Sequence, residues 1–162
     1  MPSATAPSLP AEEHSTNVSP ATFKVAIIGG GIGGLATALS LSTYIPALKN
    51  VTVYEQAPAY SEIGAGVGIG VNAGRVLQKF GVWEQANAIS GVRNDIHRST
   101  RRWDNGGLIV DVVAHSKNGE QDSGVEQLWV HRAEFLEVLV EEIHKRGCAK
   151  LETDKRAVKV EV

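Results

Sequence analysis

The stretch KVAIIGGGIGGLATALSL, residues 24–41, places five glycines within six positions, between an apolar run and an Ala/Leu-rich run. Glycine inside a helix or strand costs about 0.5–1 kcal/mol relative to alanine, so such a cluster indicates a tight turn or a close approach of the backbone to another group. Residues 25–28 are short, apolar and largely β-branched, as in a strand buried on both faces of a parallel sheet. From Leu35 the apolar spacing becomes helical, and Pro46 ends it. The pattern predicts a strand, a glycine turn and a helix.

Three of the glycines match a spacing with a known physical role. Gly29, Gly31 and Gly34 fit G-x-G-x-x-G, in which the first glycine allows the turn, the second admits a pyrophosphate, and the third lets the helix pack on the strand. Residues 51–54 then predict a second strand, and Glu55 follows about 20 residues after the last glycine, where a carboxylate accepts the hydroxyls of an adenosine ribose. We therefore predict a Rossmann-like α/β unit that binds the adenosine diphosphate half of a nucleotide cofactor.

Composition limits the remaining classes of function. The 162 residues suit one domain, and Lys plus Arg (16) nearly balances Asp plus Glu (18), which argues against nucleic-acid binding or an anionic membrane surface. The single cysteine, Cys148, fits a reducing compartment, so we expect a cytoplasmic protein. Residues 1–22 are rich in Pro, Ser, Ala and Thr and lack an apolar signal-peptide core, so they are predicted to be a disordered leader, with no transmembrane segment.

A second group of glycines falls at every other position in SEIGAGVGIGVNAGRVL, residues 61–77. This alternation favours an extended segment with backbone exposed on one side, although a flexible loop remains an alternative. Asn72 is expected to cap a helix whose apolar positions are Val76, Leu77 and Phe80, with Gly81 at its end.

The rest of the sequence predicts hairpins and one more helix. Residues 96–103 and 108–113 flank an Asn-Gly turn, which is typical of a two-stranded ribbon. A short strand at 128–130 leads into an apolar helical stripe at Leu136, Leu139, Val140 and Ile143. Arg132 stands at the start of that helix, against its dipole, and so calls for an anionic or carbonyl-rich neighbour.

The chain ends in an alternation of Val158, Val160 and Val162, which predicts a final strand. The five histidines have no metal-ligand spacing, and no Ser–His nucleophile motif is present, so no metal site and no catalytic acid or base is predicted.

The sequence resembles the flavin-dependent aromatic hydroxylases of the salicylate hydroxylase type. The resemblance rests on VAIIGGGIGGLATALSL, on VTVYEQAPAYSEIGAGVGIGVNAGRVLQKFGVW and on VHRAEFLEVL, in the family's order and approximate spacing. It implies that the first block holds the FAD pyrophosphate, that Glu55 holds the adenosine ribose, that backbone at Gly68 lies along the flavin, and that Arg132 contacts FAD. It also implies an α/β, Rossmann-like FAD-binding domain with β-hairpin insertions, incomplete at its C-terminus, over residues 23–162.

The same resemblance implies an activity. Members of this family use NADH or NADPH and O2 to hydroxylate a small aromatic or phenolic substrate, here of aromatic or polyketide metabolism. Relatives continue into a Gly-Asp motif and a substrate domain that this sequence lacks, so we expect either a fragment or a natural truncation, without turnover on its own. Two alternatives stay open: a noncatalytic nucleotide-binding remnant, and the NAD-binding half-domain of a dehydrogenase. The sequence carries no signal for the oligomeric state.

Overall fold

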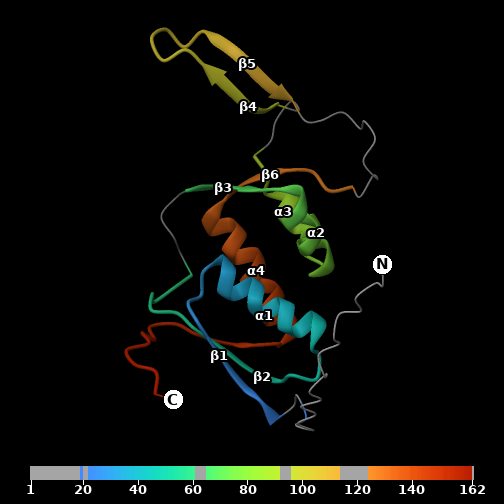
Figure 1. The fold of residues 1–162 in the computed structure, drawn as a ribbon, viewed down its shortest axis with the longest axis vertical. Helices are drawn as coiled ribbons and strands as arrows, with labels where there is room; N and C mark the ends of the chain where they lie inside the picture. Colours follow the sequence, from blue (N-terminus) through green and yellow to red (C-terminus); the bar gives the residue numbers. More distant parts are fainter. Residues whose placement is uncertain (1–18, 20–21, 61–64, 92–95, 114–123, 162) are drawn as a thin grey trace, which may run out of the picture.

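The computed structural model describes residues 19, 22–60, 65–91, 96–113 and 124–161 (Figure 1). In chain order the elements are β1 (Lys24–Ile28), α1 (Ile32–Tyr44), β2 (Asn50–Tyr54), β3 (Gly66–Ile69), α2 (Val71–Lys79), α3 (Trp83–Ala88), β4 (Ile96–Arg101), β5 (Leu108–Val113), β6 (Leu128–His131), α4 (Arg132–Arg146) and β7 (Lys150–Glu152). The short helix α3 has no counterpart among the elements expected from the sequence.

The unit β1–α1–β2 has the predicted form of strand, glycine turn, helix and second strand. β1 and β2 are parallel, with Val25 beside Val51 and Ile27 beside Val53. The helix α1 begins after Gly31 and buries Leu35, Ala38 and Leu39. Because parallel neighbours end at the same edge, the glycine turn and Glu55 lie at one edge of the sheet.

A third parallel strand, β7, joins the other side of β2, with Leu151 beside Val53. The final strand predicted from Val158 and Val160 is wrong, because these residues lie outside any strand and are 89% and 79% exposed; Val162 lies outside the described residues. β7 can be a strand because β2 offers it an edge with free hydrogen-bonding groups. Residues 158–161 pair with no strand among the described residues.

Helices cover one face of the sheet. Both α1 and α4 lie on that face in Figure 1, and α1 contacts β1, β2 and α4. The expectation that β1 is buried on both faces is therefore wrong: Ile28 is 60% exposed, and Lys24 and Ala26 are exposed as well. A hollow of about 590 Å³, lined mainly by residues from the amino ends of the three strands, lies away from the glycine turn.

The glycine-alternating segment forms the strand β3, as predicted, and it pairs with β6 in an antiparallel ribbon. The helix α2 starts two residues earlier than expected, with Gly70 instead of Asn72 at its N-cap. Val76 is 42% exposed, whereas Leu77 and Phe80 are buried. Gly74 and Leu77, three residues apart, share the buried side of α2, and Trp83 and Val125 pack against Gly74. Val76 lies off this side.

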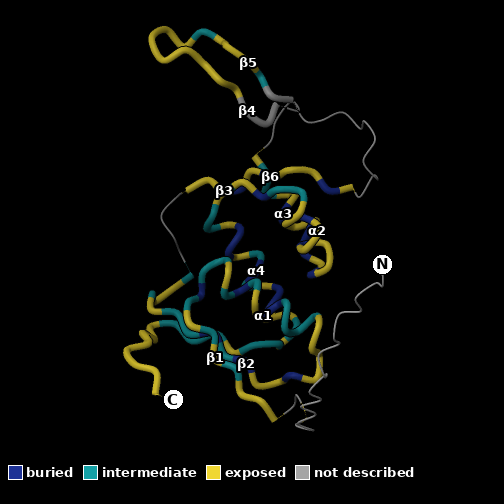
Figure 2. The backbone as a smooth tube through the Cα atoms, in the orientation of Figure 1, coloured by how far each residue is buried: buried dark blue, intermediate teal, exposed yellow. Residues whose placement is uncertain are grey.

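The predicted hairpin is formed by β4 and β5, and it projects from the rest of the molecule (Figure 1). Figure 2 shows most of its described residues as exposed, in contrast to the body. Trp103 at its tip is 97% exposed, and Leu108, Ile109 and Val110 are about half exposed or more. The apolar strand β5 thus has one antiparallel partner and no covering layer among the described residues.

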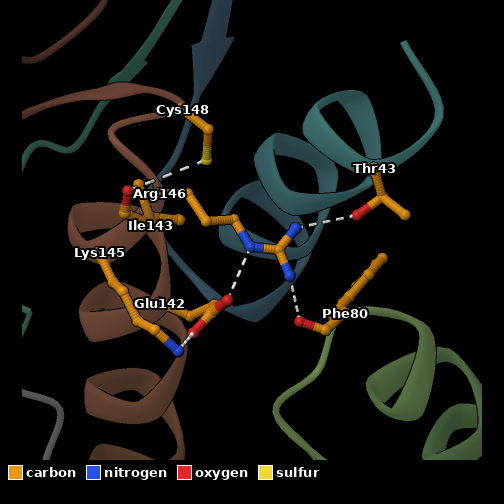
Figure 3. A network of polar contacts seen from close by, with 7 residues as sticks. All are labelled: Thr43, Phe80, Glu142, Ile143, Lys145, Arg146 and Cys148. Carbon is orange, nitrogen blue, oxygen red and sulfur yellow. Dashed lines mark hydrogen bonds and ion pairs between the residues drawn. The ribbon is translucent and has the colours of Figure 1, made fainter. Parts of the chain in front are cut away.

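The body is held together by one apolar core and one polar network. The core joins α1, β2, β6, α2, α3 and α4; its most buried large side chains are Phe80, Leu35, Leu39, Leu128, Leu136, Leu139, Ile143, Val53 and Val82. The network centres on Arg146 at the end of α4 (Figure 3). Its guanidinium donates to the buried Glu142 carboxylate at 2.7 Å, to the Thr43 hydroxyl at 3.0 Å and to the Phe80 carbonyl. Arg146 therefore connects α4 to the ends of α1 and α2.

Candidate nucleotide-binding site

The glycine turn has the geometry that its sequence predicts. Gly29 has φ of +102°, a conformation that L side chains rarely adopt, and its N–H donates to the Tyr54 carbonyl at 2.8 Å. At Gly34 a Cβ would overlap the Gly29 carbonyl oxygen and would lie 3.3 Å from Ile27. The helix thus packs on the strand at a distance that only glycine permits. The three N–H groups of the first turn of α1 have no acceptor within the helix, and that turn carries no acidic side chain.

Glu55 follows β2 directly, and its carboxylate is fixed by two backbone donors. Gly30 N–H donates to Oε2 at 2.6 Å, and Ala57 N–H donates to Oε1 at 2.8 Å. The hydrogen bond from Ala57, followed by that from Gly30, lowers the pKa of the Glu55 carboxyl below its ordinary value, against the effect of burial. The carboxylate is therefore ionised at neutral pH, and each oxygen keeps a lone pair for another donor.

Tyr60 packs beside Gly30 and Glu55. A Cβ on Gly30 would lie 2.5 Å from Tyr60 Cε1 and 2.9 Å from Glu55 Cβ, so Gly30 sits between the phenol ring and the Glu55 side chain. The Tyr60 hydroxyl is buried and has no hydrogen-bond partner among the described residues. Burial, and then the charge of Glu55, raises the pKa of Tyr60, which keeps the phenol neutral.

Arg132 lies beside the glycine turn, although it is distant from the turn in sequence. Its backbone N–H donates to the Ala65 carbonyl at 3.0 Å. Its Nη2 is 3.9 Å from the position that a Cβ on Gly31 would occupy. The Arg132 guanidinium and the start of α1 therefore lie beside the same glycine turn, and both attract an anion.

Gly68 lies farther along, on β3, where it pairs with Trp129 of β6. The structure thus brings Gly29, Gly31, Glu55 and Arg132 to one edge of the sheet, and Gly68 onto the strand that leads away from it. Sequence reasoning missed three participants: Gly30 and Ala57, which act through backbone N–H groups, and Tyr60. The backbone donors have no sequence signal. Tyr60, five residues after Glu55 in an irregular segment, belongs to no periodic pattern.

These residues fit a dinucleotide with a pyrophosphate. Gly31 leaves open space toward Arg132, the start of α1 supplies unpaired N–H groups, and the ionised Glu55 supplies acceptors for neutral hydroxyls. No group of three or more His, Cys, Asp or Glu side chains suited to a metal ion occurs within the described ranges. Among the helices of those ranges, none combines the length and apolarity that crossing a membrane requires.

The fold and this site define a nucleotide-binding protein of the Rossmann-like class. Residues 22–161 match the family described as FAD binding domain, so the chain belongs to that family and FAD is its cofactor. The chain is 36% identical over 152 residues to a salicylate hydroxylase of Pseudomonas putida. This alignment covers 91% of this chain and 32% of the relative. It is 40% identical over 125 residues to a 6-methylsalicylate 1-monooxygenase of Aspergillus terreus, covering 72% of this chain and 26% of the relative.

Solved structures support the same fold. The flavin-dependent monooxygenase PieE, solved in complex with FAD and substrate, superposes with a TM-score of 0.65 at 16% identity, over 81% of this chain and 23% of that one. A tetrameric 2-methyl-3-hydroxypyridine-5-carboxylic acid oxygenase gives a TM-score of 0.65 at 20% identity, over 86% of this chain and 33% of that one. The chain therefore spans about a quarter to a third of the length of these proteins.

Proposed function

We propose that this chain is the FAD-binding part of a monooxygenase that uses NADH or NADPH and O2 to hydroxylate a small aromatic or phenolic substrate. The observation that carries the proposal is the joint placement of Glu55 and Arg132 on either side of the glycine turn, in a chain of the FAD-binding family. The names of the relatives support the class of substrate, since they include salicylate, 6-methylsalicylate and 3-hydroxybenzoate hydroxylases. We further propose a cytoplasmic location.

In this proposal the chain's own residues bind and orient the cofactor. Glu55 accepts the hydroxyls of the adenosine ribose, because its two oxygens are already aligned by the N–H groups of Gly30 and Ala57. The first turn of α1 and Arg132 hold the pyrophosphate, and Gly31 supplies the room for it. Gly68 and its strand lie along the ring end of the cofactor.

FAD, when bound, supplies the chemistry of hydride acceptance and O2 activation, which no side chain can perform. The overall reaction balances as one aromatic C–H, one O2, one NAD(P)H and one proton giving one phenol C–OH, one NAD(P)⁺ and one water. The protein's contribution here is to position the cofactor and keep water from its ring.

Binding of FAD by this chain is the first test. Isothermal titration with FAD, ADP and NAD⁺ should give binding of FAD and ADP, with FAD tighter than NAD⁺, and the purified protein should turn yellow. A colourless protein that prefers NAD⁺ would favour the half-domain of a dehydrogenase instead.

The hydroxylase activity is tested on the protein as the cell produces it. With FAD, NADH or NADPH and a panel of hydroxybenzoates and phenols, ¹⁸O from labelled O2 should enter the product ring. FAD binding and NAD(P)H oxidation that release only hydrogen peroxide across the panel would support a noncatalytic remnant and contradict the proposed hydroxylation.

A further inference from the structure

The ribbon formed by β3 and β6 has two unlike faces. One face carries Ile69, Leu128 and Val130, which are buried against the body. The other carries Gly66, Gly68, Trp129 and His131, all of which are exposed. Figure 1 shows the helices α2, α3 and α4 on one side of this ribbon. The opposite side is a strip of bare backbone beside an indole ring.

Trp129 lies across Gly68, its register partner. A Cβ on Gly68 would be 2.9 Å from Trp129 Cζ3 and 3.2 Å from Cη2, so the six-membered ring of the indole occupies the space that a side chain would need. Glycine at position 68 is therefore required for the ring to lie flat on the strand. Trp129 remains 39% exposed, because nothing among the described residues covers its outer side.

The backbone of Trp129 is fixed from the other edge of β6. Gly91 N–H donates to the Trp129 carbonyl at 2.8 Å, and Trp129 N–H donates to the Ser90 hydroxyl at 3.3 Å. Since these groups point away from β3, Gly68 and Trp129 form a non-hydrogen-bonded pair, the kind in which side chains of opposite strands approach most closely. The strand backbone under the indole is thus fixed, and the ring presents a partly exposed aromatic surface.

This surface lies on a path that starts at the glycine turn. Arg132 joins the two, because its backbone bonds to Ala65, just before β3, and its guanidinium lies beside Gly31. From Gly66 to Gly68 the strand advances about 7 Å, at roughly 3.4 Å per residue. A ligand anchored by phosphates at Gly31 that runs along β3 meets Gly66 first and the indole of Trp129 next.

We propose that Trp129, seated on Gly68, is the aromatic surface against which the isoalloxazine ring of FAD lies. A flat ring system pairs well with an indole, and the flanking glycines allow close contact with the backbone. The inference rests on the FAD site proposed above and adds a residue that specifies the ring end of the cofactor, independently of the Glu55 end.

The experiment compares ligands with and without the ring. Trp129→Ala should weaken FAD binding by about threefold to tenfold, as expected for one aromatic pair, while ADP binding stays within about twofold of wild type. Fluorescence of the bound flavin should rise, because a stacked indole quenches it. Trp129→Phe should restore part of the affinity. Trp103→Ala, at the exposed tip of the hairpin, is the matched control and should change neither ligand.

The outcomes separate the two proposals. If wild-type protein binds neither FAD nor ADP, the FAD site and this inference both fail. If wild type binds FAD and Trp129→Ala binds FAD and ADP as wild type does, or loses both equally, only the assignment of Trp129 is overturned. It is also overturned if salicylate, without FAD, quenches the tryptophan fluorescence of wild type but not of Trp129→Phe, while FAD affinity is the same in both. The indole would then contact the substrate. Thermal melts of each variant must match that of wild type, which shows that the variants are folded. If Trp129→Phe and Trp129→Ala are both folded and both bind FAD with wild-type affinity, the proposal is wrong.

Discussion

The glycine turn after β1 and the glycine strand β3 each contain crowded and open glycines, which serve two different purposes. In the turn, Gly34 and Gly30 are crowded by the protein's own atoms, from the Gly29 carbonyl, Tyr60 and Glu55. At Gly31 and Gly66 an added Cβ would meet almost nothing. The comparison teaches that glycine can be kept either to let the protein pack or to leave room for a ligand. The atoms that an added Cβ would touch distinguish a glycine kept for packing from one that leaves room for a ligand. Substitutions at these glycines test the distinction.

The largest expected effect is at Gly34, where the neighbour is rigid backbone. Gly34→Ala should lower the free energy of unfolding by about 3 kcal/mol or more, since α1 must move away from β1. Urea unfolding followed by circular dichroism measures it. Gly33→Ala is the control in the same helix, because a Cβ there has nothing within 4 Å, and it should be neutral or stabilising. Equal losses in both variants would remove the packing role of Gly34.

Gly31→Val should separate binding from folding. The N-cap backbone at Gly31 is extended and its surroundings are open, so unfolding should change by only about 1 kcal/mol. The branched side chain would fill the space for the pyrophosphate, and affinity for both FAD and ADP should fall by about 100-fold, or about 2.7 kcal/mol. Titration calorimetry checks this, and a variant that binds ADP normally would place the pyrophosphate elsewhere.

Glu55→Gln probes the ribose end. The variant should weaken FAD and ADP equally, by about 1–3 kcal/mol, because a charge-assisted acceptor becomes a neutral amide. Glu126→Gln, at an exposed residue remote from the turn in sequence, serves as the charge-matched control. A loss restricted to FAD would contradict the assignment of Glu55 to the adenosine ribose.

Gly68→Ala tests the packing role of glycine in strand β3. The added methyl would lie 2.9 Å from an indole that is partly exposed and can tilt outward, so stability should fall by about 1 kcal/mol or less. The part of the tryptophan emission that Trp129→Phe removes should shift to longer wavelength in Gly68→Ala, as the ring becomes more hydrated. A loss as large as that at Gly34 would show that β3, too, is closed by packing.

The smallest effect concerns pH. The folded-state pKa of Glu55 is depressed below its ordinary value of 4.5, so the stability that this carboxylate contributes is fully present above that value and is lost as the pH falls through the folded-state pKa. The difference in unfolding free energy between wild type and Glu55→Gln should therefore be constant near neutral pH and shrink below about pH 4.5. A difference that grows on acidification would contradict the two backbone hydrogen bonds.

The sequence predicted the parts of the fold and site that are encoded in contiguous residues. The turn geometry of Gly29 and Gly34 and the position of Glu55 follow from one β–α–β unit. Strand pairing was harder to predict. Apolar and polar residues alternate more regularly at 158–162 than in Lys150–Glu152, yet only Lys150–Glu152 pairs with the edge of β2. The contact of Trp129 with Gly68 depends on a register between strands about 60 residues apart, which no local pattern contains.

The pairing of β2 with β7 also limits when the sheet can form during synthesis of the chain. Thr52 pairs with Lys150, and Glu55 N–H donates to the Glu152 carbonyl at 2.8 Å, so the backbone that carries Glu55 is fixed by residues synthesised nearly 100 positions later. At about 5–20 residues per second, a ribosome needs roughly 5–20 s to supply them. During that interval β2 has one open edge and the corner around Glu55 lacks its outer strand. If Glu55 holds the adenosine ribose as proposed, that part of the FAD site is complete only after α4 and β7 have been synthesised.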